Sequence, residues 1–303
     1  MDANREALDR FAQSLKARGS PQTEARYVRA GESLIAAIGT MPLSQLKRHD
    51  IQRALAKLHA GGLAPRTLAV TLSAWRSWFR YLAKTDTAIN PTVFTGLKAP
   101  KAPKRLPNAL TETEAVRLVA PPDADDAPSR PARDQAMFEV LYGCGIRVGE
   151  LIGLDLGDVD LANGEIRVFG KGRKERVVPL GAPASSAIAA WLLERHDSLG
   201  QRPETALFLG TRGERISAQV VRRTLKSRAV ERGISSNVYP HRLRHSFASH
   251  VLQSSGDLRA VQELMGHASI ASTQVYTHLD FQHLAKVYDQ AHPRARKKPR
   301  GDP

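Results

Sequence analysis

The sequence has little cysteine, no long apolar run and too few acidic residues to balance its basic ones. Cys144 is the only cysteine among 303 residues, which excludes intrachain disulfides and cysteine-based zinc sites and fits a reducing cytoplasm. No apolar run approaches the ~20 residues of a membrane-spanning helix, and residues 1–5 contain no apolar signal core. We therefore expect a cytoplasmic protein without a membrane anchor.

The charge balance points to a polyanionic partner. Lysine and arginine number 45 against 30 aspartate and glutamate residues, which gives a formal net charge of +15. Nucleic acid is the first candidate for such a basic chain. A membrane surface is disfavoured because the basic residues are scattered and do not form one face of an amphipathic helix. The length is typical of two domains, and 42% hydrophobic residues suffice for a core in each.

Residues 1–97 are predicted to form a helical domain that binds DNA. Apolar residues recur at helical spacing in four segments: Leu8, Phe11, Leu15; Tyr27, Leu34, Ile35, Ile38; Ile51, Leu55, Leu58; and Leu68, Leu72, Trp75, Phe79, Leu82. Ser20 before Pro21, and Asp50, are expected to be helix N-caps. Basic residues between the stripes are suited to phosphate contacts, although a solvated helix face has the same pattern: Arg26, Arg29, Lys47, Arg48, Arg53, Arg66, Arg76 and Arg80.

A linker rich in proline and lysine is predicted over residues 98–110. It lacks apolar periodicity, so we expect an extended segment that follows a nucleic-acid backbone. The DNA-contact candidates of the chain are Arg66, Arg76, Lys101, Lys104 and Arg173. Thr111 and Glu114 have the spacing of a capping box and begin a second domain over residues 111–291. Residues 292–303 are expected to be a basic tail, in which residues 294–300 are disordered.

The second domain is predicted to be mainly helical with one small sheet. A helical stripe that includes Met137 and Val140 ends at glycines 143 and 145, and a new helix begins near Val148. Segments 165–169 and 175–180 alternate like the two strands of a hairpin around Lys171. Further helices are expected over 182–195, 217–232, 241–253, 258–265, around Tyr276 and over 281–291.

Six residues of this domain have the chemistry needed to transfer a phosphodiester onto a tyrosine: Arg147, Lys171, His241, Arg244, His267 and Tyr276. Planar guanidinium groups can neutralise both non-bridging phosphate oxygens. A tyrosine hydroxyl is a usable nucleophile when a neighbour accepts its proton, and a lysine on a hairpin can protonate the leaving oxygen. This chemistry requires no metal ion and no cofactor.

Each residue alone also has a structural interpretation. Arg147 and Glu150 are spaced for an ion pair within one helical turn, and Tyr276 alone is more typical of a packing residue. A zinc site at His241 and His245 is disfavoured, since no glutamate lies between them. His245, His250 and Cys144 are interpreted as structural.

The joint pattern resembles the tyrosine recombinase (phage integrase) family. The resemblance is carried by Arg147, the Lys171 hairpin, and the segments 240–245, 264–267 and 275–278, and finer detail in 254–264 and 276–295 is similar to the recombinases that resolve chromosome dimers. The fold implied is an N-terminal four-helix, SAM-like core-binding domain followed by the catalytic domain.

The resemblance implies a role for each site residue. Tyr276 attacks the scissile phosphate and forms a 3′-phosphotyrosyl bond, Arg147, Arg244 and His267 stabilise the pentavalent state, His241 assists proton transfer and Lys171 is the general acid. It also implies a site-specific DNA duplex as substrate, a heterotetramer with the sister recombinase XerD, and regulation by the DNA translocase FtsK at the nucleoid. In the family the C-terminal helix docks on a neighbouring protomer, and Leu284, Val287 and Tyr288 form an apolar stripe suited to this.

Three other functions stay open from the sequence. A type IB topoisomerase uses similar chemistry without a tetramer, and a phage or integron integrase has the same catalytic half. A DNA-binding accessory protein of this kind recognises a site without cutting it, which the presence of all six catalytic residue types disfavours.

Overall fold

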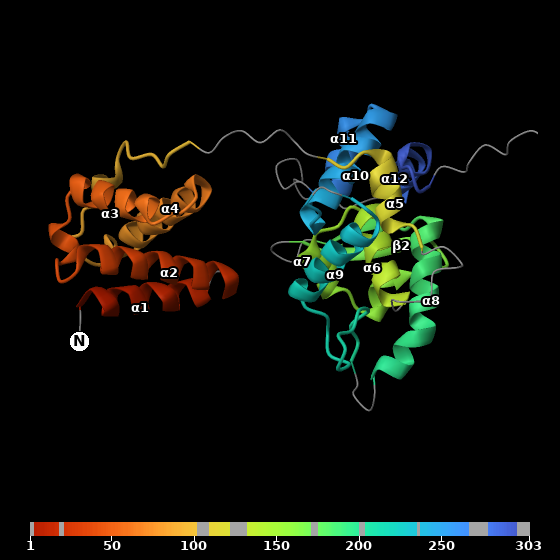
Figure 1. Ribbon diagram of the computed structural model, residues 1–303, viewed down its shortest axis with the longest axis horizontal. Coiled ribbons are helices and arrows are strands. Elements are labelled where there is room, and N and C mark those ends of the chain that lie inside the picture. The colour runs from red at the N-terminus through yellow and green to blue at the C-terminus, as the bar shows by residue number, and fades with distance from the viewer. Residues whose placement is uncertain are drawn as a thin grey trace, which may run out of the picture. The chain divides into compact units, whose positions relative to one another are not determined.

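The computed structural model describes residues 3–17, 21–101, 109–121, 132–170, 175–199, 204–234, 237–266 and 278–295. The chain divides into two compact units, Met1–Leu106 and Pro107–Pro303, and each is described by itself (Figure 1). No helix in these ranges combines the length and the apolar character that crossing a membrane requires.

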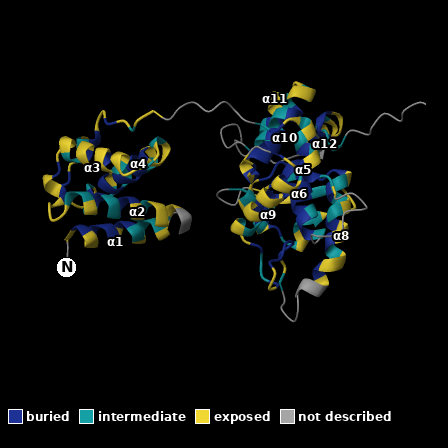
Figure 2. Ribbon diagram, in the orientation of Figure 1, coloured by how far each residue is buried: buried dark blue, intermediate teal, exposed yellow. Residues whose placement is uncertain are grey.

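The N-terminal unit contains the four predicted helices. They are α1 (Ala3–Lys16), α2 (Pro21–Ile38), α3 (Arg48–Ala60) and α4 (Pro65–Leu82), with 3-10 turns η1 (Leu43–Gln45) and η2 (Pro91–Phe94). The apolar stripes face inward, as the buried faces in Figure 2 show. Two tryptophans of α4 connect it to its neighbours: Trp75 Nε1 donates to the Ala30 carbonyl at 2.5 Å and Trp78 Nε1 to the Ala7 carbonyl at 3.3 Å. Helix α4 is thus joined to both α2 and α1.

The predicted caps of this unit need one correction. Helix α2 begins at Pro21 as expected, while Ser20 lies outside the described residues. Asp50 is not the N-cap of α3, because the helix begins earlier, at Arg48. Asp50 is the third residue of the helix, and its carboxylate accepts a hydrogen bond from the backbone N–H of Lys47 at 3.0 Å. That N–H has no partner within the helix, so Asp50 stabilises the helix start.

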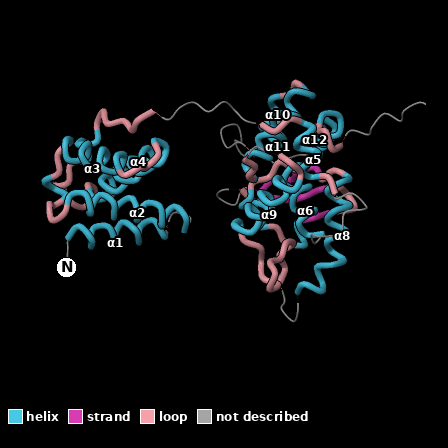
Figure 3. Tube along the Cα trace, viewed as in Figure 1, coloured by secondary structure: helices cyan, strands magenta, loops and turns pink. Residues whose placement is uncertain are grey.

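The C-terminal unit is helical around a small antiparallel sheet (Figure 3). Its elements are α5 (Glu112–Val119), α6 (Ala132–Gly143), α7 (Val148–Gly153), η3 (Leu156–Asp158), β1 (Val159–Asp160), β2 (Glu165–Phe169), β3 (Glu175–Pro179), α8 (Ala182–Leu199), α9 (Ala218–Glu231), α10 (Pro240–Ser255), α11 (Leu258–Met265) and α12 (His278–Ala291). The predicted hairpin is confirmed, with Val168 opposite Arg176 in the register of β2 and β3. The short strand β1, which pairs with β2, was not predicted.

Helix α6 lies at the centre of this unit and is buried on nearly all sides. Met137, Val140 and Leu141 are fully buried, and α8 packs along the helix. Cys144, just after α6, is also fully buried, and burial raises the pKa of its thiol to about 12, which agrees with its interpretation as a packed residue. The predicted capping box of α5 is present: Thr111 Oγ1 accepts from the Glu114 N–H at 3.1 Å and Glu114 accepts from the Thr111 N–H at 2.9 Å.

The C-terminal helix packs on its own domain, which differs from the expectation of docking on a neighbour. In α12, Leu284 and Tyr288 are buried against this chain's core, where the helix contacts α10 and β3. Arg294 after the helix forms an ion pair with Glu139, a residue buried in α6, with Nε 3.2 Å from Oε2. The prediction of a disordered tail is therefore wrong at Arg294. The amphipathic stripe was identified correctly, but periodicity does not specify which surface covers it.

Candidate active site

Arg147 is held at a sharp turn between α6 and α7. Gly145 has a φ of +58°, and a Cβ there would lie 2.3 Å from the ring of Phe247, so glycine is required on both conformational and steric grounds. The turn makes Arg147 the N-cap residue of α7.

The predicted ion pair between Arg147 and Glu150 is present. Arg147 Nη1 lies 2.7 Å from Glu150 Oε1, and the Arg147 backbone N–H donates to Oε2 at 2.8 Å. The pair does not bury the arginine, because its side chain stays 46% exposed whereas that of Glu150 is 4% exposed. The structural and the catalytic interpretations of Arg147 are therefore compatible.

Helix α10 contributes His241 and Arg244 from its first two turns. Pro240 occupies the first helical position, so the two residues lie three apart on one face. Arg244 is buried and donates to the carbonyl of Gly145 at 2.7 Å and to the carbonyl of Met265. His241 is exposed. Both line a pocket of about 390 Å³ together with Arg147, Glu150, Phe169 and Gly170.

Arg176 is a site residue that the sequence analysis missed. It lies on β3, is 6% exposed, and forms two hydrogen bonds with Glu150, at 3.0 and 2.9 Å. Its Nε donates to the Leu264 carbonyl at 3.2 Å. A signal was available, because Arg176 alternates with Val178 in β3 and so occupies a position that faces the core.

The electrostatics of the site centre on Glu150. Burial raises the pKa of this carboxyl, but the hydrogen bonds and charge of Arg176 and the hydrogen bonds of Arg147 outweigh burial and bring the pKa to about 2. Burial and the nearby charge of Arg147 lower the pKa of Arg244 to about 9, against the opposing effect of Glu150, whose Oε2 lies 3.7 Å from Arg244 Nη1. With these pKa values, Glu150 and Arg244 are both ionised at neutral pH.

Three of the six predicted catalytic residues, Lys171, His267 and Tyr276, lie outside the described residues. The described chain includes residues close to each of them in sequence: Gly170 lines the pocket, Gly266 ends α11 in the left-handed conformation, and α12 begins at His278. The structure brings Arg147, His241 and Arg244 together in one pocket.

Two further histidines of α10 were predicted to be structural. His250 is buried, its Nδ1 accepts from the Tyr142 hydroxyl at 2.9 Å, and its Nε2 donates to the Leu110 carbonyl at 2.8 Å. The Leu110 N–H donates in turn to Ser246 Oγ at 2.8 Å. The residue at the end of the predicted linker is thus fixed to α10 twice. His245 is half-buried on the same helix.

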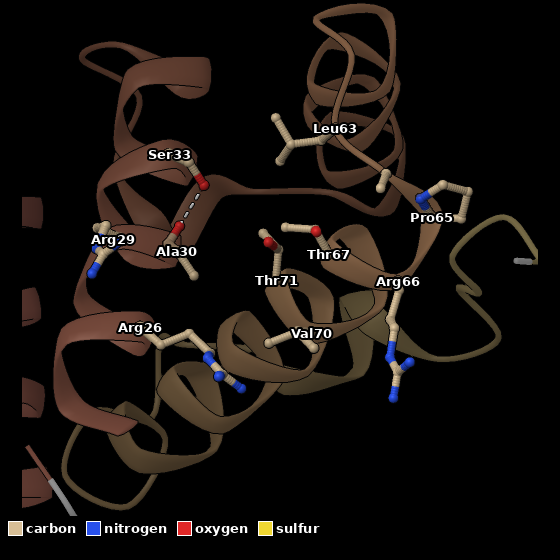
Figure 4. A pocket seen from close by; sticks show the side chains of 11 residues that line it. Arg26, Arg29, Ala30, Ser33, Leu63, Pro65, Arg66, Thr67, Val70 and Thr71 are labelled. Atoms are coloured by element: carbon tan, nitrogen blue, oxygen red, sulfur yellow. Dashed lines mark hydrogen bonds between the residues drawn. The ribbon is translucent and has the colours of Figure 1, made fainter. Parts of the chain in front are cut away.

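A basic groove lies on the N-terminal unit (Figure 4). It has a volume of about 980 Å³ and runs between α2 and the first turns of α4. Arg26 and Arg29 of α2 and Arg66 of α4 line it, and all three are exposed. A groove with guanidinium groups on both sides is suited to a polyphosphate backbone.

The other DNA-contact candidates have different environments. Arg76 is half-buried and donates to the carbonyls of Phe94 and Leu97, so it joins α4 to the segment after η2 and does not line the groove. Lys101 is exposed at the end of the described linker residues, and Lys104 and Arg173 lie outside the described residues.

Comparison with known proteins identifies the family of both units. Residues 108–283 match the phage integrase family, and residues 8–86 match its N-terminal SAM-like domain. The chain is 52% identical to tyrosine recombinase XerC 1 of Ralstonia nicotianae, covering 84% of this chain and 82% of that protein. It is 47% identical to tyrosine recombinase XerC of Chromobacterium violaceum, with 98% of each chain covered.

A solved structure has the same fold over most of its length. The pre-cleavage complex of XerH site-specific recombinase bound to difH substrate is 25% identical with a TM-score of 0.65, covering 92% of this chain and 82% of that one. The pocket built from Arg147, His241 and Arg244 lies in the unit that matches the integrase model. The chain belongs to the phage integrase family of tyrosine recombinases, enzymes that cleave and rejoin DNA.

Proposed function

We propose that this recombinase cuts its site through a 3′-phosphotyrosyl intermediate formed by Tyr276. The observation that supports the assignment is the convergence of Arg147, Arg244 and His241 on one pocket beside the end of strand β2. Arg147 and Arg244 bind the non-bridging oxygens of the scissile phosphate, and His267 donates a further hydrogen bond to them. Guanidinium groups fixed before the substrate arrives need no reorganisation as charge develops in the transition state.

The proposed cleavage step transfers the phosphate from the 5′-oxygen of the DNA to Tyr276. Tyr276 Oη attacks phosphorus and its proton passes to His241, since a free tyrosine with a pKa near 10 is a poor nucleophile at neutral pH. The bond from phosphorus to the 5′-oxygen breaks, and Lys171 protonates that oxygen. The phosphotyrosyl bond retains the energy of the phosphodiester, so a 5′-hydroxyl of a partner duplex reseals the strand without ATP.

The domains and partners of the reaction are part of the same proposal. Residues 1–97 form the domain that binds the core of the site, and the groove lined by Arg26, Arg29 and Arg66 contacts its backbone. The likeness to XerC proteins supports resolution of chromosome dimers, in a heterotetramer with a sister recombinase XerD and under an FtsK translocase at the nucleoid.

A nicked suicide duplex that carries a candidate recombination site tests this function. Wild type and Tyr276→Phe are incubated with it in chelator, with and without the sister recombinase, and resolved on a denaturing gel. We expect a covalent protein–DNA band from wild type alone. If neither protein is trapped under any condition while both bind the duplex, the chain acts as a DNA-binding accessory protein.

A further inference from the structure

Arg176 is a buried cation for which the proposed reaction has no role. Its side chain is 6% exposed, and it is not among the residues that line the pocket of Arg147, His241 and Arg244. A buried guanidinium is costly unless its donors are satisfied and its charge is balanced. Its partners therefore show what holds it in place.

Glu150 balances this charge through a planar, bidentate contact. Nη1 and Nη2 of Arg176 donate to the two carboxylate oxygens at 3.0 and 2.9 Å. Such paired contacts fix the orientation of both groups, which a lysine at the same position cannot do. The same carboxylate accepts two hydrogen bonds from Arg147, so its four acceptor positions are filled.

The arrangement distributes charge unequally around the pocket. Within the described residues, three guanidinium groups, of Arg147, Arg176 and Arg244, lie within 4 Å of the Glu150 carboxylate. Arg176 makes the bidentate contact and is buried away from the pocket, whereas Arg147 and Arg244 line it. The excess positive charge is therefore presented where a phosphate binds, by the two arginines that line the pocket.

Arg176 also fixes the end of α11. Its Nε donates to the Leu264 carbonyl at 3.2 Å, and Arg244 donates to the next carbonyl, of Met265. A Cβ on Gly266 would lie 3.0 Å from Arg176 Nη1, so this glycine, with a φ of +60°, lets the backbone pass close to the guanidinium. One side chain thus connects β3, the start of α7 and the end of α11.

We propose that Arg176 is a positioning residue for DNA cleavage, which orients Glu150 and the α11 terminus so that Arg147 and Arg244 hold the scissile phosphate in line. The proposal rests on the proposed function of this pocket. Arg176 acts through Glu150 and touches no substrate atom. A displacement of about 1 Å at a reacting centre lowers rates by on the order of 10²-fold.

The test measures single-turnover cleavage of the suicide duplex and its Kd for Arg176→Lys, Arg176→Gln, Glu150→Gln and the double variant Arg176→Gln/Glu150→Gln. We expect Arg176→Lys to lower the cleavage rate by on the order of 10²-fold with Kd within about twofold of wild type. The double variant is expected to be no slower than the slower single variant, because both changes remove one linked unit.

Arg195→Lys is the matched control. Arg195 is equally buried in this unit, at 5% exposed, but it donates to the carbonyls of Glu204 and Ala206 and not to a site residue. The proposal is overturned if Arg176→Lys cleaves at the wild-type rate, or if Arg176→Lys and Arg195→Lys lose the same fraction of the cleavage rate at the same loss of Tm. It is also overturned if the double variant loses rate by the product of the two single-variant factors. Where Arg176→Gln does not fold, Arg176→Lys decides, since it keeps the charge and most of the buried stem. Absence of cleavage by wild type would reject the proposed function instead.

Discussion

Arg147 and Glu150 form an ion pair of 2.7 Å whose two ends lie in different environments, with 46% of the arginine side chain exposed and 4% of the glutamate. The carboxylate is fixed by the protein, and the guanidinium is fixed by the carboxylate while it remains open to the pocket. The two residues should therefore respond differently to substitution.

Arg147→Gln is expected to remove activity with little loss of stability. A preorganised donor to a developing oxyanion contributes about 10²- to 10³-fold to a rate, whereas an exposed ion-pair partner contributes at most about 1 kcal/mol to stability. Suicide-duplex cleavage and urea unfolding of the same preparation measure both effects. Equal losses in rate and stability would contradict the assignment.

Glu150→Gln is expected to destabilise the protein by about 3–5 kcal/mol at neutral pH, because it leaves the buried Arg176 without a counter-charge. The pKa of Glu150, about 2, lies below its ordinary value of 4.5, so its contribution to stability is present above pH 4.5 and is lost as the pH falls toward 2. Urea unfolding of both proteins at pH 7, 4 and 3 should show the difference shrinking. A constant difference would mean that the charge of Glu150 is not what stabilises the site.

His250 is expected to make stability depend on pH below about 6.5, a higher range than that of Glu150. Burial lowers its pKa, against the hydrogen bond to Leu110, so the folded state resists protonation and stability falls as the pH drops below 6.5. In His250→Gln, Tm should fall less steeply than in wild type as the pH is lowered from 7.5 to 5.5.

Tyr142→Phe should lower the free energy of unfolding by about 1–3 kcal/mol, because it leaves Nδ1 of His250 without its donor at 2.9 Å.

The groove residues are expected to control the salt dependence of DNA binding. Arg26→Gln and Arg66→Gln should each reduce the slope of log K against log salt by about 0.9, if each arginine neutralises one phosphate. Arg5→Gln is the control, because Arg5 pairs with Glu32 at 3.2 Å and does not line the groove. Unchanged slopes for both groove variants would place the DNA on another face.

Local patterns in the sequence predicted most of the fold. The stripe from Leu68 to Leu82 identified α4, and the alternation around Lys171 identified β2 and β3, because both patterns record which side of an element is buried. Contacts between distant segments were not predictable in the same way. Arg176 meets Glu150 and the Leu264 carbonyl only after folding, and the stripe on α12 did not reveal that its own domain covers it.

Leu110, near the start of the described part of the second unit, is attached to α10 through both of its backbone polar groups. Its N–H and carbonyl are both bonded to α10, through Ser246 and His250, and Arg244 lies within two turns of each. Leu110 is therefore tied to the same helix that carries His241 and Arg244. A shift of the Leu110 backbone would therefore strain two hydrogen bonds to the helix that presents His241 and Arg244 to the pocket.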